Sequence, residues 1–173
     1  MITTLHQWII KVWYQGSNWK YILKPLSWIY YVFISLRILL YKIGFMKIHR
    51  SNYPIIIVGN ITVGGTGKTP FTIWLANHFI GMGYRPAVLT RGYKGKIGDT
   101  PIEVSKESNP EIVGDEAIMI ASKLKCPVIA HPDRNLSIKY VSDKNIDFII
   151  SDDGLQHYQM DRDYEILIVD NER

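Results

Sequence analysis

The sequence predicts an α/β fold in which a mostly parallel sheet is flanked by helices. Short continuous apolar runs alternate with helix-patterned segments, which is typical of parallel strands that are buried on both faces. A glycine-rich loop follows the first run and precedes the first helix of this series. Before the sheet, residues 1–50 are rich in Trp, Tyr and Lys. We therefore divide the chain into a membrane-associated helical segment, residues 1–50, and a core that binds a nucleotide, residues 51–173.

Charge is distributed unevenly along the chain. The net charge is only +4, yet residues 1–98 contain 12 Lys and Arg residues and neither Asp nor Glu. Residues 99–173 contain 8 basic and 16 acidic residues. An N-terminal half that lacks Asp and Glu favours anionic partners, either nucleic acid or an anionic membrane. The single cysteine, Cys126, excludes an internal disulfide and suits a reducing compartment.

The first predicted element is a helix from Lys20 to Gly44. Trp and Tyr beside Lys are typical of the headgroup layer of a bilayer. The longest uncharged stretch within this helix, residues 25–36, has 12 residues and is too short to span a bilayer. We expect the helix to lie in or dip into an anionic leaflet. A span in which Arg37 snorkels and a helix buried against the rest of the protein are the alternatives.

Two further expectations concern the same N-terminal segment. An RNA-binding surface would also fit its aromatic and basic composition, but no glycine-and-aromatic signature of such a module occurs, so we expect no nucleic-acid partner. Met1–Ile10 lacks a basic start, a continuous apolar stretch and a small-residue cleavage site, so we expect no cleavable signal peptide.

Five apolar runs predict the strands of the sheet. They are Ile55–Val58, Ala87–Thr90, Val128–Ala130, Phe148–Ile150 and Ile166–Val169. In parallel α/β sheets, ligands bind beyond the carboxyl ends of the strands. The polar residues that follow the runs are therefore site candidates: Arg91 to Tyr93, His131 to Arg134, Asp152, Asp153 and Asp170.

The loop after the first strand has the features of a phosphate cradle. Its sequence is Gly64-Gly65-Thr66-Gly67-Lys68-Thr69. Glycines let backbone N–H groups face a phosphate, and the following helix adds the positive end of its dipole. Lys68 would reach the outer phosphates and the Thr69 hydroxyl would bind Mg²⁺. Thr62 stands where the common pattern has glycine, so a turn without a ligand is the alternative, but the strand before and the helix after favour a P-loop NTPase-like core.

The helix after this loop is predicted from Lys68 to about Gly81. Pro70 falls in its first turn, where a missing N–H is harmless. Apolar or aromatic residues recur with helical spacing and predict the face that packs on the sheet. This stripe consists of Phe71, Trp74, Leu75, His78 and Phe79.

Carboxylates follow the fourth predicted strand and also begin an earlier helix-patterned segment. P-loop enzymes hold magnesium with a carboxylate at the end of a strand beside the loop, which is where Asp152 and Asp153 fall. Two adjacent carboxylates repel each other unless a cation is near, which favours this role over a simple turn before Gly154. Gln156 and His157 follow within one turn. Farther upstream, Asp115 is by itself equally consistent with a helix N-cap.

Taken together, these motifs resemble the tetraacyldisaccharide 4'-kinase family, the lipid A 4'-kinases of bacterial outer-membrane biogenesis. The resemblance is carried by residues 58–70, 91–93, 114–116 and 151–157, and extends to residues 25–28. In this family Thr62 is the common residue at its position, which removes the objection to the loop.

The resemblance implies ATP-dependent phosphorylation of the 4' hydroxyl of tetraacyldisaccharide 1-phosphate in lipid A biosynthesis. It implies ATP and Mg²⁺ as cofactors and a lipid disaccharide as substrate. It also implies a peripheral or monotopic location on the cytoplasmic face of the bacterial inner membrane. A substrate that resides in a bilayer would explain why an aromatic, basic segment precedes the core.

The resemblance also implies roles for individual residues. Asp115 is similar to the general base of the family, and Lys68 would neutralise phosphate charge. The nucleotide loop would consist of Thr62, Val63, Gly64, Gly65, Thr66, Gly67, Lys68 and Thr69. The magnesium site would be formed by Thr69, Glu116, Asp152 and Asp153, and the other active-site residues would be Arg91, Tyr93, Arg134, Gln156 and His157.

Members of the resembled family continue into a second lobe beyond the position of Arg173, and a histidine in that lobe pairs with the base. We expect this C-terminal lobe to be absent here and, if Arg173 is the terminus, little or no kinase activity. A membrane-associated P-loop ATPase of the partitioning type is an alternative, but Val63 stands where those proteins have a second lysine. A GTPase would need an Asn-Lys-x-Asp motif, which the sequence lacks. A non-catalytic remnant is the third alternative.

Overall fold

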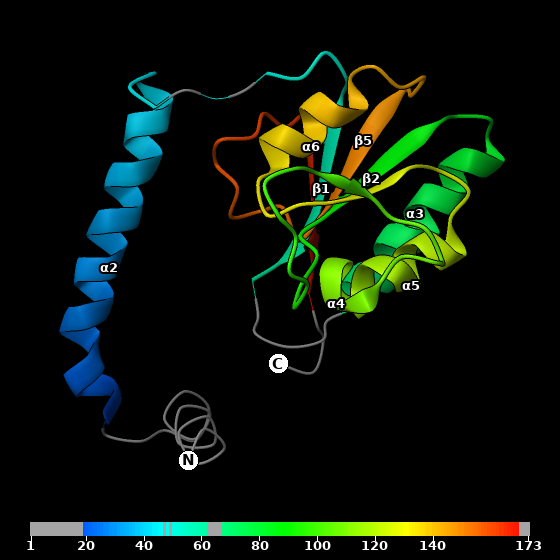
Figure 1. The fold of residues 1–173 in the computed structure, drawn as a ribbon. Coiled ribbons are helices and arrows are strands. Elements are labelled where there is room, and N and C mark those ends of the chain that lie inside the picture. The colour runs from blue at the N-terminus through cyan, green and yellow to red at the C-terminus, as the bar shows by residue number, and fades with distance from the viewer. Residues whose placement is uncertain (1–18, 47, 49, 62–66, 170–173) are drawn as a thin grey trace. The chain divides into compact units, whose positions relative to one another are not determined.

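The computed structural model describes residues 19–46, 48, 50–61 and 67–169 (Figure 1). The predicted nucleotide-loop residues 62–66 and Asp170 therefore lie outside the described residues. The chain forms two compact units, residues 1–47 and residues 48–173. Each unit is considered by itself.

The first unit contains helix α2, Trp19–Lys42, close to the predicted span. Pro25 lies inside the helix and Lys42 in its last turn. Large apolar side chains are exposed along it, with Trp28 70% and Phe33 67% accessible. None of the helices in the described ranges is long and apolar enough to cross a bilayer.

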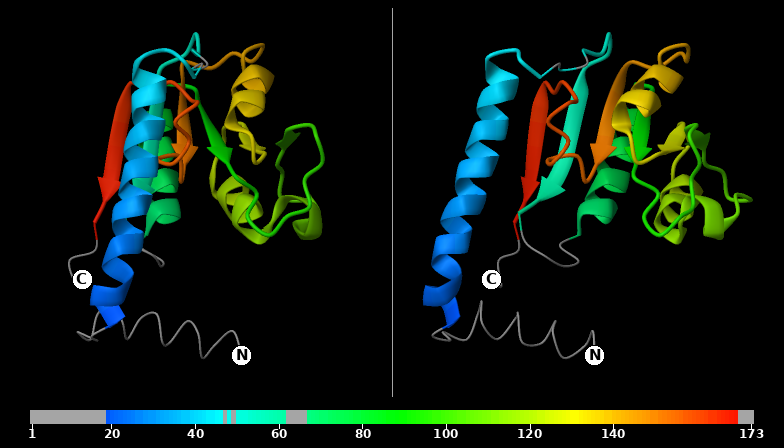
Figure 2. Two further views of the ribbon diagram at one scale, coloured as in Figure 1. Left: turned by 90° about the vertical axis from the view of Figure 1, so that its left-hand side faces the viewer. Right: turned by 60° about the vertical axis from the view of Figure 1, so that its left-hand side comes forward.

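The second unit is built on a six-stranded sheet with the order β3-β4-β2-β5-β1-β6 (Figure 2). The strands are β1 Ile55–Asn60, β2 Pro86–Thr90, β3 Ile102–Glu103, β4 Val128–Ala130, β5 Phe148–Asp152 and β6 Tyr164–Ile168. All pairs are parallel except β3–β4. The predicted mostly parallel sheet is therefore confirmed.

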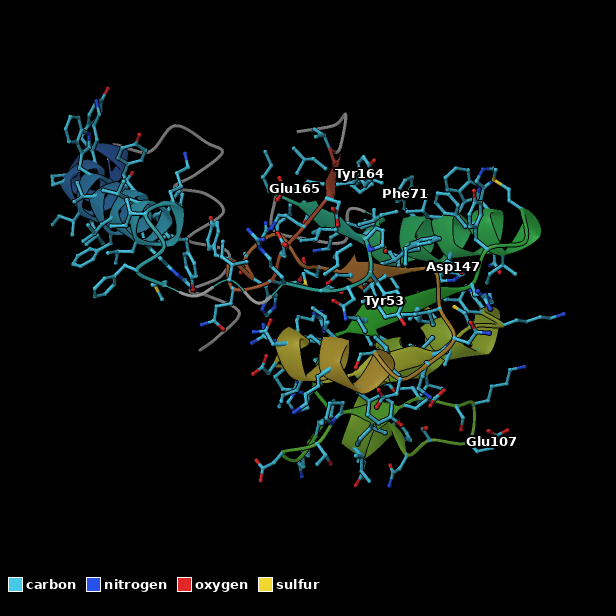
Figure 3. All side chains as sticks on the ribbon, turned by 90° about the horizontal axis from the view of Figure 1, so that it is seen from above. Tyr53, Phe71, Glu107, Asp147, Tyr164 and Glu165 are labelled. Atoms are coloured by element: carbon cyan, nitrogen blue, oxygen red, sulfur yellow. The ribbon has the colours of Figure 1, made fainter. Side chains whose placement is uncertain are left out.

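Two strands at the ends of the sheet differ from the sequence expectation. Strand β3 was not predicted, because its two residues are too few to show a periodic pattern. It pairs antiparallel with β4, Ile102 opposite Ala130. Strand β6 begins at Tyr164 rather than Ile166, and its residues are exposed or half-buried because it pairs only with β1. Tyr164 and Glu165 lie at this end of the core unit (Figure 3).

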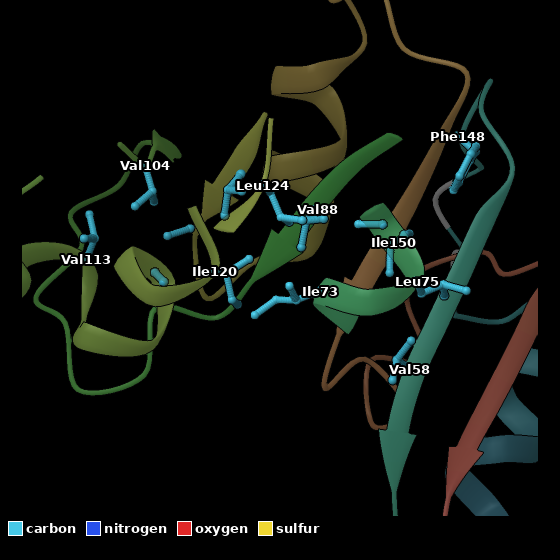
Figure 4. Packing of buried hydrophobic residues seen from close by; sticks show 14 residues of the cluster. Val58, Ile73, Leu75, Val88, Val104, Val113, Ile120, Leu124, Phe148 and Ile150 are labelled. Carbon is cyan, nitrogen blue, oxygen red and sulfur yellow. The ribbon is translucent and has the colours of Figure 1, made fainter. Parts of the chain in front are cut away.

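Helices cover both faces of the sheet, as parallel strands require. On one face, α3 (Lys68–Gly81), α4 (Pro110–Val113) and α5 (Asp115–Lys123) contribute to a core that includes Val58, Val88 and Ile150 (Figure 4). On the other face, α6 (Arg134–Val141) packs over a second cluster around Ile57, Leu89 and Ile149. Each strand therefore contributes alternate residues to two cores, which explains the continuous apolar runs.

The stripe predicted for α3 is partly wrong. Leu75 is buried as expected, but Trp74 is 57% exposed and His78 is also exposed. The buried face is instead formed by Thr69, Thr72, Ile73, Leu75 and Ala76. The small side chain of Ala76 and the hydroxyl of Thr72, which donates to Asp152 at 2.9 Å, let α3 approach the sheet closely. Trp74 and His78 are thereby placed on the outer side, whereas Phe71 and Phe79 are half-buried and pack against the core, as predicted.

Candidate active site

A cavity of about 760 Å³ opens at the carboxyl ends of β1, β2 and β5, beside the first turn of α3. This is the place that the topology of a parallel sheet predicts. Several predicted site residues line it together. They are Gly67, Lys68, Thr69, Arg91, Tyr93, Glu116, Asp152 and Asp153. Residues that sequence analysis did not assign, Pro70, Thr90 and Met119, complete the described lining.

Lys68 is held at the cavity by two oxygen atoms. Its Nζ donates to Oδ1 of Asn60 at 2.7 Å and to Oδ1 of Asp153 at 2.9 Å. Asn60 is the last residue of β1, and its role was not predicted although it lies within the resembling motif. The ammonium group is partly accessible, since the Lys68 side chain is 21% exposed, so it faces the cavity rather than the core.

Asp153 adopts an unusual backbone conformation. Its φ of 55° lies in the left-handed region, which is strained for a residue with a side chain. A side chain on the next residue, Gly154, would place its Cβ 2.7 Å from Oγ of Ser151. The turn after β5 is therefore tight, and it directs the half-exposed Asp153 carboxylate toward Lys68.

A second cluster of oxygen atoms surrounds the Thr69 hydroxyl. Thr69 Oγ1 lies 2.6 Å from Oε1 of Glu116 and 3.3 Å from Oδ2 of Asp152, and it can donate to either carboxylate. Thr72 Oγ1 donates to the other oxygen of Asp152 at 2.9 Å. Thr72 was missed at the sequence level, although its spacing from Thr69 places both hydroxyls on one face of α3.

Asp152 is a weaker acid than an ordinary aspartate. Burial raises its pKa from 3.8 to about 6, and the negative charge of Glu116 acts in the same direction. The hydrogen bonds from Thr72 and Thr69 and the positive charge of Arg134 oppose this rise. Two carboxylates thus share one hydroxyl in a poorly solvated place, where a nearby cation would stabilise both.

Arg134 lies behind the site and does not line the cavity. It is 1% exposed, and its guanidinium donates to the backbone oxygens of Asp152 at 2.7 Å and His131 at 3.2 Å. Burial lowers its pKa to about 10, while the charges of Asp152 and Asp153 act in the opposite direction. The resemblance placed Arg134 at the active site, and the structure shows that it anchors the end of β5 from the interior.

Arg91 and Tyr93 reach the cavity from the loop after β2, and this loop packs on the turn that begins α5. Gly114 has φ 84°, and a Cβ there would lie 2.3 Å from the backbone oxygen of Tyr93. Only glycine fits this contact. The close approach explains why both motifs contain glycine, and it fixes Tyr93 relative to Glu116.

Asp115 is the first residue of α5 and is exposed. The N-cap position belongs to Gly114, which makes no capping hydrogen bond through a side chain. The alternative interpretation of Asp115 as an N-cap is therefore wrong. Asp115 is not among the residues that line the described cavity, whereas its neighbour Glu116 is.

Gln156 and His157 also fall outside the described lining of the cavity. Gln156 is exposed and His157 is half-buried. Burial lowers the pKa of His157, as do the positive charges of Arg134 and Arg91, so the neutral imidazole is favoured. The backbone oxygen of His157 accepts a hydrogen bond from Arg162 at 2.7 Å, which fixes the turn after β5.

Comparison with known proteins identifies the relatives of this chain. Residues 19–173 match the model of the family LpxK, Tetraacyldisaccharide-1-P 4'-kinase. The chain is 46% identical over 162 residues to tetraacyldisaccharide 4'-kinase of Psychromonas ingrahamii, covering 93% of this chain and 51% of that protein. It is 45% identical over 163 residues to tetraacyldisaccharide 4'-kinase of Coxiella burnetii, covering 93% and 50%.

A solved structure agrees with the sequence comparison. The crystal structure of LpxK from Aquifex aeolicus in complex with ATP matches with a TM-score of 0.76 and 35% sequence identity. The match covers 88% of this chain and 50% of that one. The chain thus spans about half the length of the relatives that it matches.

Proposed function

The chain belongs to the LpxK family of tetraacyldisaccharide-1-P 4'-kinases, and from this premise we propose that it forms the nucleotide-binding half of a lipid kinase. The reaction is transfer of the γ-phosphate of ATP to the 4' hydroxyl of tetraacyldisaccharide 1-phosphate, in lipid A biosynthesis. One observation carries the proposal: a lysine and a hydroxyl–carboxylate cluster meet at the start of α3 in a single cavity.

ATP binding is supported by the position of Lys68 and by the relative that was crystallised with ATP. Phosphoryl transfer depends mainly on positioning and on neutralisation of charge. Lys68 stands at the N-terminus of a 14-residue helix, where backbone N–H groups add positive potential. Its bonds to Asn60 and Asp153 keep it extended at the cavity until phosphate oxygens replace them. We propose that residues 62–69 bind the nucleotide together.

The residues around Thr69 fit Mg²⁺. The donor set consists of one hydroxyl and the carboxylates of Glu116 and Asp152, all oxygen ligands. Within the described ranges, no group of three or more His, Cys, Asp or Glu side chains could hold a metal ion, so the protein would supply two carboxylates and a hydroxyl here. Mg²⁺ in kinases is typically held by one or two carboxylates together with substrate phosphates. Bound Mg²⁺ would neutralise the charge that develops on the phosphates. Asp153 acts on the site indirectly, because its carboxylate accepts a hydrogen bond from Lys68.

We assign proton removal from the attacking hydroxyl to Asp115. The exposed position of this carboxylate at the start of α5, beside Glu116 at the cavity, leaves it accessible to an acceptor that approaches from solvent. Arg91 and Tyr93 line the same cavity and contribute positive charge and an aromatic contact. His157 supports the turn that follows Asp152 and Asp153, because its backbone N–H donates to the Gly154 oxygen at 3.0 Å, and the exposed Gln156 lies in the same turn.

Membrane association is the second part of the proposal. Helix α2 exposes Trp28, Tyr31 and Phe33, each at least 67% accessible. Lys24, Arg37 and Lys42 on the same helix would contact anionic headgroups. We place the protein on the cytoplasmic face of the bacterial inner membrane as a peripheral or monotopic protein, where its lipid disaccharide substrate resides.

The test is transfer of radiolabelled phosphate from ATP to tetraacyldisaccharide 1-phosphate. The chain is joined to the second half of a full-length relative, since the match covers about half of each relative. Labelled lipid is expected, and its formation should depend on Mg²⁺. ATP hydrolysis without labelled lipid would instead support a membrane-associated P-loop ATPase, and the absence of both reactions would support a non-catalytic remnant.

The role of Asp115 is tested in the same protein. Asp115→Asn is expected to slow transfer on the order of 10²-fold or more, with ATP affinity nearly unchanged, because a base acts on the acceptor. Glu111→Gln is the matched control, since Glu111 is an exposed carboxylate in the preceding short helix α4. Equal loss of transfer and of ATP binding in Asp115→Asn would refute the assignment.

A further inference from the structure

Exposed side chains, most of them aromatic, lie on the outer side of α3 and in the turn that follows it. We call this group the α3 aromatic surface, and it consists of Trp74, His78, Met82 and Tyr84. Trp74 is 57%, Met82 61% and Tyr84 48% exposed. The Trp74 and His78 rings stack with centroids 5.4 Å apart, and Phe71 lies 5.5 Å from Trp74. Trp74 and His78 therefore hold each other in place while both face solvent, and the half-buried Phe71 connects them to the core.

Trp74, His78 and Met82 belong neither to the buried core nor to the described lining of the nucleotide cavity, whereas the Tyr84 ring also meets Phe148 edge-on at 6.3 Å. The residues of α3 that line the cavity are Lys68, Thr69 and Pro70, all in its first turn. The face of α3 that packs on the sheet is formed by smaller side chains. A large contiguous exposed apolar surface on a folded unit is typical of an interaction site.

The charges around this surface are positive. Helix α3 contains no acidic residue. Asn77 Nδ2 donates to the backbone oxygen of Lys123 at 3.3 Å, which places the end of α5 beside α3. Lys123 and Lys125 are both exposed there. At the other end of the surface, Asp147 is neutralised by Arg85, at 2.7 Å.

We infer that the α3 aromatic surface, together with Lys123 and Lys125, is a contact of the core unit with an anionic lipid bilayer, separate from helix α2. Trp and Tyr rings beside lysine are suited to the headgroup layer, and each lysine near an anionic surface adds attraction. A protein partner is less favoured, because lysine is depleted in protein interfaces. Lipid binding by this surface does not require phosphoryl transfer, so it is measured independently of the proposed kinase reaction.

The first experiment places a reporter on the surface of the full chain. Cys126 is the only cysteine, so Cys126→Ser with Met82→Cys allows one polarity-sensitive dye to be attached beside the rings. Cys126→Ser with Glu107→Cys is the matched control, because Glu107 is exposed and lies on the far side of the core unit from Phe71 (Figure 3). Vesicles of phosphatidylglycerol mixed with phosphatidylcholine are compared with vesicles of phosphatidylcholine alone.

The dye at position 82 is expected to shift to the blue with the anionic vesicles and much less with the neutral ones, while the dye at position 107 does not shift. An unchanged dye at position 82 on chains that sediment with the vesicles would overturn the inference. A blue shift without vesicles that grows with protein concentration would also overturn it, since it would identify a contact between copies of the chain.

The second experiment changes the charge. Lys123→Glu with Lys125→Glu is expected to weaken binding to anionic vesicles by roughly 30-fold or more at low salt. The control, Lys106→Glu with Lys139→Glu, makes the same change in net charge at exposed lysines elsewhere in the core unit. Equal losses in the two double variants would show that only net charge matters and would refute a specific surface. Far-UV circular dichroism checks that both variants fold.

Discussion

Replacing the buried carboxyl of Asp152 by an amide is expected to stabilise the protein without ligands and to remove its response to magnesium. Asp152 is 4% exposed and has a pKa raised by burial from 3.8 to about 6. Because the folded protein binds this proton more tightly than the unfolded chain, the neutral form favours folding. The stability that Asp152 contributes is present below about pH 4 and is lost as the pH rises through about 6.

The magnitude follows from the size of the shift. A rise in pKa from 3.8 to about 6 means that ionising this carboxyl costs about 3 kcal/mol more free energy in the folded protein than in the unfolded chain. Asp152→Asn remains neutral at every pH and keeps an oxygen that accepts from Thr72. The difference in unfolding free energy between variant and parent is therefore expected to grow from near zero at pH 4 to about 3 kcal/mol at pH 8.

Urea unfolding with EDTA at both pH values measures this difference. With an m-value of about 2 kcal/mol/M, the midpoint of Asp152→Asn should exceed that of the parent by about 1.5 M at pH 8. Asp153→Asn is the control, because that side chain is 60% exposed and its ion pair with Lys68 contributes about 1 kcal/mol at most. A variant that is no more stable than the parent at pH 8 would refute the account of Asp152 as a desolvated carboxylate.

Three further predictions concern the residues that hold the site. Arg134→Met should lower the unfolding free energy by about 3 kcal/mol, because two backbone oxygens lose a charged hydrogen-bond donor. A loss below about 1 kcal/mol in urea unfolding would contradict the anchoring role of Arg134. Gly114→Ala should lower the unfolding free energy by about 3 kcal/mol or more, because its Cβ would meet the Tyr93 backbone oxygen. The control Gly98→Ala has open space around it and should change the unfolding free energy by less than about 1 kcal/mol. Similar melting temperatures of the two variants would contradict the packing argument. Lys68→Met should change stability by less than about 1 kcal/mol, because its ion pair is half-exposed, and a larger loss in urea would show that Lys68 is structural.

The strands and the place of the site could be predicted from the sequence. Strands such as Phe148–Asp152 are buried on both faces, so their apolar runs are unbroken and easily seen. The topology of parallel strands then brings Lys68, Asp152 and Arg91 to one edge of the sheet. The hydroxyl cluster could be expected in outline, since Thr69 lies in the first turn of a helix and Asp152 ends a strand.

Other features depend on packing that local patterns do not encode. Helix α3 has apolar residues on more than one side, so spacing alone could not show that Trp74 faces outward. Strand β3 exists through its pairing with β4 rather than through its own two residues. The buried position of Arg134 depends on two backbone oxygens that lie far from each other in the sequence. In each case a tertiary contact decided the outcome.

Calorimetric titration of the chain with ATP, with and without Mg²⁺, tests the central claim most directly. The account predicts saturable binding that requires Mg²⁺, that raises the unfolding free energy by about 2.7 kcal/mol at a hundredfold excess over Kd, and that is lost in Lys68→Ala. Absence of heat and of stabilisation in the parent, or equal binding by parent and Lys68→Ala, would contradict a nucleotide site at the start of α3.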